Sequence, residues 1–261
     1  MKKSIQIIAT AFAILLGNVG FSQVDSVYIV KGDSVLAVYA TTDVDSVIFY
    51  NPNPIDTTTN STITDVDGNV YTSVTIGTQE WMIENLRTTK YSDGTAIPNV
   101  TDKTQWTVLS TGSWCHYDND NQYDTIYGKL YNWYAVETGK LCPTGWHVPT
   151  DAEWTVLTDY LTANGHSGAE GTALKATSGW NDYNGQSGNG TDDYGWNGLP
   201  GGYLRGNNGD FDIVGTNGLW WSSSNDASGS AWYRILNNHN DELATSYGYQ
   251  RNGYNIRCLR D

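Results

Sequence analysis

Basic residues are scarce in this sequence, and the shortage limits which partners it can have. Lysine and arginine together number 14 against 28 aspartates and glutamates, for a formal net charge of −14. A chain this acidic is repelled by phosphate backbones and by anionic lipid, so we expect neither nucleic acid nor an anionic membrane as a partner. A ligand should instead be neutral or cationic, and a neutral polysaccharide would satisfy this condition.

Apolar runs of transmembrane length are also missing. The apolar stretch 7–16 follows Lys2 and Lys3, but it is too short to span a bilayer. Residues 1–22 are therefore predicted to be a signal peptide that is cleaved near Ser22. We expect an exported protein, whether secreted, periplasmic or at the cell surface, with no transmembrane segment. Because no cysteine follows the cleavage point, we expect no lipid anchor there.

Cysteine is rare, and the common catalytic and metal-binding motifs are absent. Three cysteines in an exported chain predict one disulfide and one remaining thiol. No hydrolase elbow, phosphate-binding loop, dinucleotide fingerprint or paired-histidine metal motif occurs. The four histidines are scattered, so a transition-metal site is not expected. His147 is expected to be a hydrogen-bonded structural residue.

What is present begins with a short β-rich segment, residues 23–50. It holds three β-like runs, at residues 27–30, 35–39 and 47–50, with a hairpin turn expected at Lys31-Gly32-Asp33. Three short strands are marginally stable alone, so they should pack on the main domain or pair with another copy. Residues 51–64 contain two prolines, many threonines and asparagines, and no aromatic residue, which predicts a linker.

Residues 65–261 predict one α+β domain. Thr150 and Glu153 have the spacing of a capping box, and they open an apolar stripe at i, i+3 and i+7. Helical spacing predicts two helices, at residues 129–137 and 150–163. Alternating patterns predict an opening hairpin at 70–76 and 80–86, and small antiparallel sheets closed by strands at 219–222, 231–236, 243–247 and 254–260.

Between the second helix and the closing strands lies a long region rich in glycine and asparagine, residues 164–218. It exceeds an ordinary loop in length, and its interspersed aromatic residues argue against disorder. We therefore expect an ordered surface excursion. Rings and amides of this kind suit a sugar or a protein partner, and they suit loop packing equally well. The candidate ligand-binding residues are Trp180, Asn181, Tyr183, Tyr194 and Trp196.

Acidic residues of the same region could hold a cation. Carboxylate oxygens are preferred calcium ligands, so Asp182, Asp192 and Asp193 form a weak candidate metal set. The acidic run at 118–124 could also bind calcium, but it lacks the glycine and glutamate of an EF-hand loop. Calcium is therefore the one cofactor that the sequence suggests. The alternative, that these acids are solvated loop residues, is favoured.

Several separate blocks of the sequence closely resemble one known family. The most specific block is Cys142-x3-Gly145-Trp146-His147-Val148-Pro149-Thr150-x2-Glu153-Trp154, and further blocks begin at Tyr127, Leu199, Trp220 and Asn255. They are similar to the Fibrobacter succinogenes major paralogous domain over residues 64 to 261. That family looks like a branch of the C-type-lectin-like fold, which also carries the formylglycine-generating enzymes. The resemblance implies two helices, small antiparallel sheets and a long loop region that usually contacts ligand.

The resemblance also bears on the cysteines. The wider fold joins a cysteine ahead of its second helix to one in its last strand, which implies a Cys142–Cys258 disulfide here. Cys115 would remain free, and we expect a buried thiol rather than a nucleophile. The reactive cysteine pair of the formylglycine-generating enzymes is absent, so their oxidase activity is not implied and the protein is not expected to be an enzyme.

Two classes of function are consistent with these features. The first is an exported, non-catalytic binding module that recognises a glycan or a cell-surface partner through the long loop region. The alternative is a structural or interaction protein of the bacterial envelope with no small ligand. A polysaccharide-active enzyme comes third, because the sequence shows no matched acid and base pair.

Overall fold

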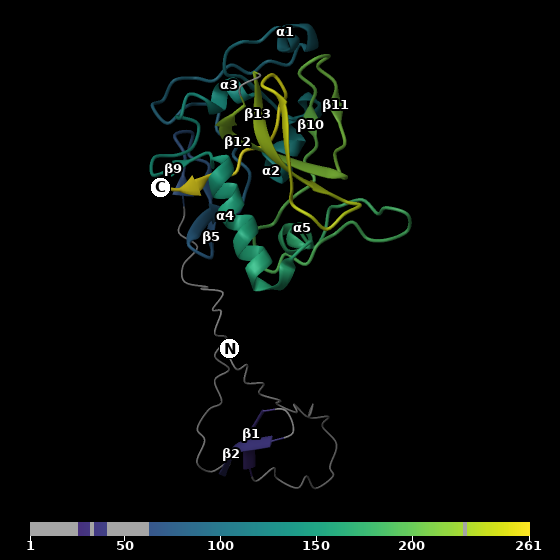
Figure 1. The fold of residues 1–261 in the computed structure, drawn as a ribbon. Helices are drawn as coiled ribbons and strands as arrows, with labels where there is room; N and C mark the ends of the chain where they lie inside the picture. Colours follow the sequence, from purple (N-terminus) through teal and green to yellow (C-terminus); the bar gives the residue numbers. More distant parts are fainter. Residues whose placement is uncertain (1–25, 32–33, 41–62, 227–228) are drawn as a thin grey trace, which may run out of the picture. The chain divides into compact units, whose positions relative to one another are not determined.

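The computed structural model describes residues 26–31, 34–40, 63–226 and 229–261, which belong to two compact units, Met1–Pro54 and Ile55–Asp261. In the first unit, β1 (Ser26–Lys31) pairs antiparallel with β2 (Ser34–Ala40) (Figure 1). The expected signal peptide, the turn at Gly32 and Asp33, the third strand and most of the linker lie outside the described residues.

The second unit mixes short helices with several small antiparallel sheets, as the sequence predicted. One sheet has the strand order β5-β6-β15-β9 and another the order β12-β13-β14; β3-β4, β7-β8 and β10-β11 are two-stranded. The strands are β3 (Ile63–Thr64), β4 (Val70–Tyr71), β5 (Ser73–Ile76), β6 (Gln79–Met82), β7 (Trp114–Cys115), β8 (Leu130–Tyr131), β9 (Trp146–His147), β10 (Tyr203–Leu204), β11 (Phe211–Asp212), β12 (Asn217–Asn225), β13 (Ser230–Asn237), β14 (Ala244–Tyr249) and β15 (Leu259–Arg260).

The described residues form more helices than the two predicted, but most of them are single turns. They are α1 (Lys103–Thr107), α2 (Asp124–Tyr127), α3 (Trp133–Val136), α4 (Asp151–Leu161) and α5 (Glu170–Leu174), with 3-10 turns at Tyr117–Asn119 and Asn121–Tyr123. Helices this short span too few residues to show a periodic apolar pattern. In the described part of the chain, no helix has the length and apolar character needed to cross a membrane.

The second predicted helix is confirmed as α4, and its capping box is complete. The Thr150 hydroxyl accepts a hydrogen bond from the Glu153 backbone N–H at 3.2 Å, and the Glu153 carboxylate accepts one from the Thr150 N–H at 2.8 Å. The predicted stripe of Trp154, Leu157 and Leu161 is buried. A π-type turn (Thr162–His166) follows, in which Gly165 has a φ of +99°.

The first predicted helix is shorter than expected. Of residues 129–137 only α3 is helical, because Leu130–Tyr131 pairs as strand β8 with β7. Asn132 marks the change, since its side-chain oxygen accepts a hydrogen bond from the Ala135 N–H at 3.2 Å and caps α3. Pairing with a distant strand therefore overrides the local helical spacing.

The predicted opening hairpin is present as β5 and β6, with Gly77 at φ +65° in its turn. The domain also begins earlier than predicted, because Ile63–Thr64, placed in the linker, pairs as β3 with β4 and Ile63 is buried. The closing runs correspond to β12 to β15. Of the last run, 254–260, only its end (β15) is a strand.

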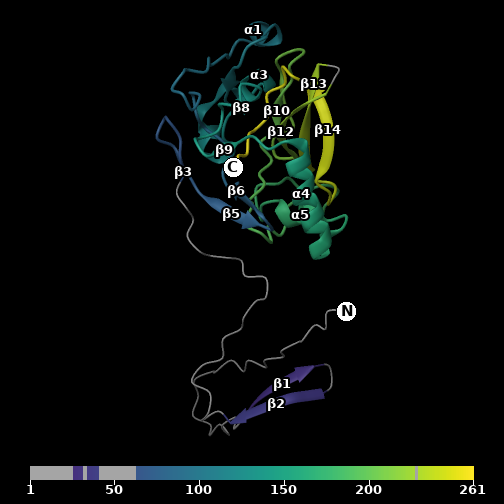
Figure 2. The same ribbon diagram turned by 60° about the vertical axis from the view of Figure 1, so that its left-hand side comes forward.

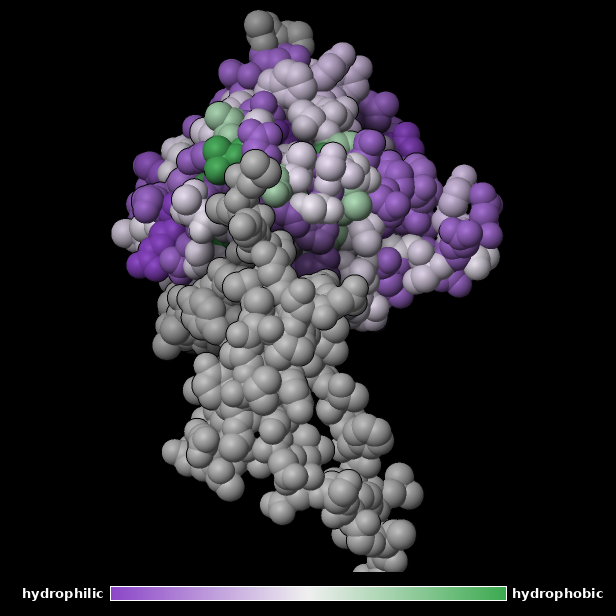
Figure 3. Space-filling view, turned by 60° about the horizontal axis from the view of Figure 1, so that its bottom comes forward, coloured by the Kyte–Doolittle hydropathy of each residue, from purple (hydrophilic) through white to green (hydrophobic). Residues whose placement is uncertain are grey.

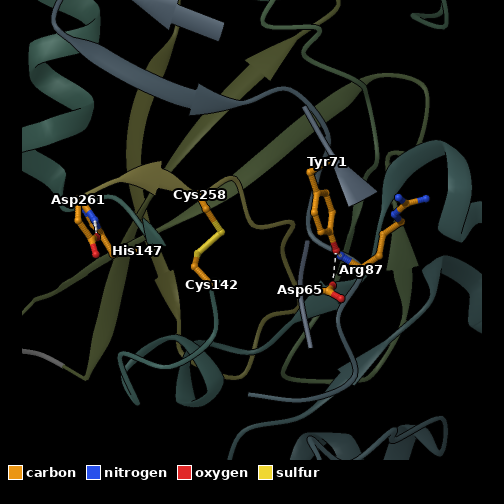
Figure 4. The surroundings of a disulfide bond; sticks show 7 residues. All are labelled: Asp65, Tyr71, Arg87, Cys142, His147, Cys258 and Asp261. Atoms are coloured by element: carbon orange, nitrogen blue, oxygen red, sulfur yellow. Dashed lines mark hydrogen bonds and ion pairs between the residues drawn. A yellow bond between two sulfur atoms is a disulfide. The ribbon is translucent and has the colours of Figure 1, made fainter. Parts of the chain in front are cut away.

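Cys142 and Cys258 form the disulfide that the resemblance implied, across a separation of 116 residues. Just beyond Cys258, β15 lies between β6 and β9, so that Leu259 pairs with Trp81 on one side and with His147 on the other. Figure 4 shows the disulfide with His147 and Asp261 on one side and with Asp65 and Tyr71 on the other. The Tyr71 hydroxyl donates a hydrogen bond to the Asp65 carboxylate at 2.7 Å. The bridge therefore ties the end of the chain to the segment that leads into α4.

Five tryptophan side chains lie together in one buried cluster that includes residues of α4. Its rings come from β6, α4, the long region and β12, and they belong to Trp81, Trp154, Trp180, Trp196 and Trp220. A second cluster beneath the other sheet contains Tyr131, Trp221 and Tyr254 with the disulfide. The tryptophans of the first cluster therefore connect distant parts of the chain.

Main-chain hydrogen bonds hold the long region 164–218 to the rest of the domain, for example from the Gly171 N–H to the Asp241 carbonyl oxygen at 2.7 Å. Figure 2 shows α5, which belongs to this region, beside α4. A Cβ atom added at Gly190 would lie 2.4 Å from the carbonyl oxygens of Thr172 and Lys175, so only glycine allows this approach. The region also forms the β10–β11 hairpin. The described surface facing the viewer in Figure 3 is largely hydrophilic, with small, separate hydrophobic patches.

Candidate functional site

A groove with a volume of about 480 Å³ opens between the β10–β11 hairpin and the β12–β13–β14 sheet. Main-chain bridges from Gly202 to Gly218 and from Leu204 to Gly253 hold the hairpin at this position. We call this the tyrosine groove. Its lining includes Tyr203, Arg205, Ile213, Tyr233, Tyr249 and Tyr254.

Three tyrosine rings form the centre of the groove. The ring centre of Tyr254 lies 4.7 Å from that of Tyr233 and 5.6 Å from that of Tyr203, and the rings are tilted to each other. Tyr254 is buried on Trp221, with ring centres 4.2 Å apart, whereas Tyr203 and Tyr233 are half-buried. Tilted arrangements of this kind are favourable for aromatic pairs. The groove therefore has a rigid floor and partly open ring surfaces above it.

Apart from Arg205, the polar side chains of the groove are neutral hydroxyls and amides. Burial raises the pKa of Tyr203 and of Tyr254, so both hydroxyls stay protonated and can donate as well as accept hydrogen bonds. The Asn252 amide donates to the Tyr254 hydroxyl at 2.8 Å, and its oxygen accepts a hydrogen bond from the Gly206 N–H at 2.9 Å. These bonds fix the position of the Asn252 side chain at the floor.

Arg205 brings a positive charge to the rim, but that charge is paired. Its guanidinium forms an ion pair with Asp212 across the hairpin and lies 5.7 Å from the ring centre of Tyr203. On the opposite wall, Gly248 lies close to the floor, because an added Cβ would be 2.9 Å from the Tyr254 hydroxyl oxygen. Only glycine at residue 248 lets the main chain of β14 approach the buried hydroxyl of Tyr254 this closely.

A smaller hollow of about 220 Å³ adjoins the tyrosine groove. Asn207 and Tyr249 line both hollows, and the smaller one adds Tyr134, Gln250 and Arg251. The Tyr249 side chain is 66% exposed. The Arg251 guanidinium donates through Nε to the carbonyl oxygen of Leu109 at 3.1 Å, which holds it at the edge of the smaller hollow.

The structure places Trp180 and Trp196, two candidate ligand-binding residues, inside the core. Their exposed fractions are 5% and 0%. The Trp196 ring centre lies 5.0 Å from that of Trp220, and the Trp180 indole donates a hydrogen bond to the carbonyl oxygen of Gly198 at 3.0 Å. Neither ring has a free face, so the expectation that they stack on a ligand is corrected: both are packing residues that hold the long region down.

The other three candidates lie outside the tyrosine groove. The main chain of Asn181 bonds to Gly215, while Tyr194 packs at its ring edge against Tyr160 with a centre distance of 6.1 Å. Tyr183 is 49% exposed, and its ring centre lies 5.3 Å from that of His239. Tyr183 is the most exposed ring among the five, Tyr194 is half-buried, and neither belongs to the residues that line the groove.

The predicted calcium set does not converge. Asp192 accepts a hydrogen bond from the Asn197 N–H at 2.7 Å, and burial raises the pKa of its carboxyl group. Asp193 lies 3.8 Å from His166, whereas Asp182 is exposed. Among the described residues, no three His, Cys, Asp or Glu side chains are placed to hold a metal ion. The three aspartates therefore do not form a calcium site in this structure.

The acidic run at 118–124 has local structural roles. Asp120 accepts a hydrogen bond from the Gln122 N–H at 2.9 Å and so caps the second 3-10 turn. Asp124 forms an ion pair with the buried Lys129 at 2.6 Å. These contacts give Asp120 and Asp124 structural roles that need no bound cation.

Two residues with potentially reactive side chains remain from the sequence analysis, Cys115 and His147. Cys115 is free and completely buried, and burial raises the pKa of its thiol, so the nucleophilic thiolate is disfavoured. The His147 ring donates hydrogen bonds to the carboxylate of Asp261 at 2.7 Å (Figure 4) and to that of Glu153 at 3.0 Å. It joins the end of the chain to the α4 cap, a structural role that matches the expectation.

The fold and the groove together define an α+β domain with a concave aromatic surface. Comparison with known families then shows the family to which this domain belongs. The model of the family described as Fibrobacter succinogenes major domain matches residues 74–260. The chain therefore belongs to this family, as its sequence blocks indicated. Neither the curated proteins nor the solved structures include a match to it.

Sequence reasoning missed the tyrosine groove because its members are far apart along the chain. Tyr203, Tyr233 and Tyr254 come from a hairpin, a central strand and a non-strand segment. One local signal was available: Tyr247 and Tyr249 alternate in β14, where they are exposed on one face of an edge strand. Exposed aromatic residues at that spacing are a stronger indication of contact than isolated tryptophans.

Proposed function

We propose that the protein is an exported, non-catalytic binding module that recognises a glycan or a cell-surface partner through the tyrosine groove. The observation that carries the proposal is the concave surface made by Tyr203, Tyr233 and Tyr254, where ring faces and neutral hydrogen-bonding groups lie together. Binding sites commonly combine aromatic walls with a few fixed polar groups. Tyrosine is suited to this role because it presents an apolar ring and a polar hydroxyl.

The long region still takes part in this proposal, but with different residues. One wall of the groove is the β10–β11 hairpin, which belongs to residues 164–218 and supplies Tyr203 and Arg205. The other wall is the sheet, which is fixed to the core through Trp221. Ligand contact by the long region thus uses residues near 203–213 in place of the buried pair Trp180 and Trp196.

The non-catalytic part of the proposal is supported by the state of the cysteines. Cys258 is held in the disulfide, and Cys115 is buried with a raised pKa. We also propose that the domain has the C-type-lectin-like arrangement. The bridge from the segment before α4 to the segment before β15 supports this, since it follows the cysteine pairing of that fold.

A glycan array and calorimetry with matched variants test the proposal. Tyr249→Ala removes an exposed groove residue, and Tyr203→Ala removes a ring from the wall; both should weaken binding of the array hit by about tenfold or more. Tyr183→Ala is the control, because it removes an equally large exposed ring outside the groove. Unchanged affinity in both groove variants, or a loss confined to Tyr183→Ala, would reject the groove as the binding site.

The alternative, a structural or interaction protein of the envelope, is favoured by the separate first unit. The β1–β2 hairpin is two-stranded in its described residues, and an isolated hairpin is marginally stable in water. Pairing with another chain would stabilise it. If the full-length chain binds no glycan on the array, and wild type and Tyr249→Ala bind isolated envelopes equally well, this alternative is preferred.

A further inference from the structure

We infer that the ligand is an uncharged, extended polysaccharide that crosses two adjacent subsites, the tyrosine groove and the smaller hollow beside it. This inference rests on the proposed binding function and specifies its ligand. The two hollows share Asn207 and Tyr249 in their linings. A chain that leaves the tyrosine groove over Tyr249 therefore enters the smaller hollow next to Tyr134.

The charged groups in the lining of the two hollows disfavour a cationic ligand. Every charged residue in the described lining is an arginine, Arg205 in the larger hollow and Arg251 in the smaller one. A cation bound there would lose water without gaining a carboxylate partner from the lining, and that loss is costly. Asp212, the acid that faces Arg205, is already occupied in its ion pair.

The charge of the whole chain excludes a strongly anionic ligand. A formal net charge of −14 repels a polyanion during its approach. The net positive charge in the hollows is small, because Arg205 is paired with Asp212, which leaves Arg251 as the other charged residue of the described lining. A neutral ligand avoids both penalties. The arginines of the lining and the net negative charge of the chain therefore both favour an uncharged ligand.

The polar groups favour a carbohydrate among uncharged ligands. The tyrosine hydroxyls can both donate and accept hydrogen bonds, and amides of Asn207, Asn252 and Gln250 lie along the same path. Sugar hydroxyls also do both, while the apolar face of a sugar ring packs on an aromatic ring. Stable protein interfaces bury about 800 Å² on each partner, over broader surfaces than this narrow strip. A protein ligand is therefore an alternative outcome of the test.

The probes are neutral oligosaccharides from glucan, mannan and xylan, each in a series of increasing length, with polygalacturonate and chitosan as anionic and cationic comparisons. We expect at least one neutral series to bind, with affinity rising with length until both hollows are filled. Its Kd should change little with salt, because a neutral ligand forms no screened ion pairs. Preferential binding of either charged polymer, or of a protein partner alone, would overturn the inference.

Variants of the smaller hollow test the second subsite. Tyr134→Ala and Gln250→Ala should weaken binding of the long oligosaccharides by about fivefold to tenfold and leave the shortest binding members unchanged. Tyr203→Ala should weaken binding at every length, because that residue lines the larger hollow. Tyr183→Ala is again the control for loss of an exposed ring. Near-ultraviolet circular dichroism verifies that each variant is folded.

The outcomes separate this inference from the proposed function. If Tyr203→Ala abolishes binding while Tyr134→Ala and Gln250→Ala change nothing at any length, the second subsite is wrong and the binding groove stands. If no variant of either hollow alters the binding of any probe, the groove itself is wrong. If only charged probes bind and Tyr203→Ala abolishes that binding, the groove stands and the uncharged ligand is wrong.

Discussion

The guanidinium carbon of Arg257 lies 4.0 Å from the ring centre of Trp196, in a completely buried stack. The hydrogen-bond partners of this arginine are neutral: the Asn85 side-chain oxygen at 2.8 Å and the main-chain oxygen of Trp196. Burial lowers the pKa of Arg257 to about 9, against the opposing charges of Glu84 and Asp192, so the group remains charged at neutral pH. The ring of Trp196 therefore covers a buried charge as well as filling the core.

We predict that Trp196→Ala destabilises the domain by about 3–5 kcal/mol, because it opens a large cavity and uncovers one side of the buried Arg257 guanidinium. Urea unfolding followed by tryptophan fluorescence measures the change. Tyr183→Ala, at an exposed position, should stay within about 0.5 kcal/mol of wild type. A Trp196→Ala variant as stable as Tyr183→Ala would show that the long region is not anchored by this ring.

Loss of the disulfide should be costly. Cys142→Ser removes a bridge between residues 116 positions apart and should destabilise the domain by about 2–5 kcal/mol. Cys258→Ser breaks the same bond, so the double variant should lose about as much as either single variant. Thermal unfolding under non-reducing conditions measures this. Fully additive losses would mean that the two cysteines contribute separately, outside a shared bond.

Cys115 should be unreactive in the native protein. Its thiol is completely buried and burial raises its pKa, so both access and thiolate formation are suppressed. Iodoacetamide should label no thiol in the folded chain and one thiol per chain in denaturant without reductant. Peptide mapping should place that label at Cys115. Labelling of Cys142 or Cys258 under these conditions would contradict the assigned bridge.

Stability should depend on pH through His147. Partial burial alone would lower the pKa of this histidine, but hydrogen bonds and charges from Asp261 and Glu153 outweigh it and raise the pKa above its ordinary value of 6.5. Burial of Glu153 is likewise outweighed by hydrogen bonds from Thr150 and His147, so its pKa falls below 4.5. Both groups are therefore charged and paired between about pH 4.5 and 6.5.

The raised pKa of His147 stabilises the fold below pH 6.5, and this contribution is lost as the pH rises through the folded-state value. The lowered pKa of Glu153 acts in the other direction and is lost as the pH falls below about 4.5. His147→Gln should reduce the fall in melting temperature between about pH 6 and pH 8. An unchanged pH profile in this variant would exclude His147 as the cause.

Local patterns in the sequence were enough for the parts of the fold whose stabilising contacts are also local. The capping box of Thr150 and Glu153 and the stripe that begins at Trp154 predicted α4, because a helix satisfies its hydrogen bonds within a few residues. Alternation predicted the β5–β6 hairpin for a similar reason. Helical spacing at 129–137 was misleading, since Leu130–Tyr131 found a hydrogen-bonding partner in β7.

The location of the groove and the roles of the aromatic residues were decided only by tertiary packing. An isolated tryptophan in a glycine-rich segment carries no local sign of what covers it. Trp196 is buried because Trp154, Trp220 and Arg257 converge on it from distant segments. The tyrosine groove likewise exists because pairing across the β-sheet and the hairpin brings Tyr203 and Tyr233 to the same buried ring, Tyr254. Exposure depends on contacts between residues far apart in the chain, and local periodicity reports only on neighbours.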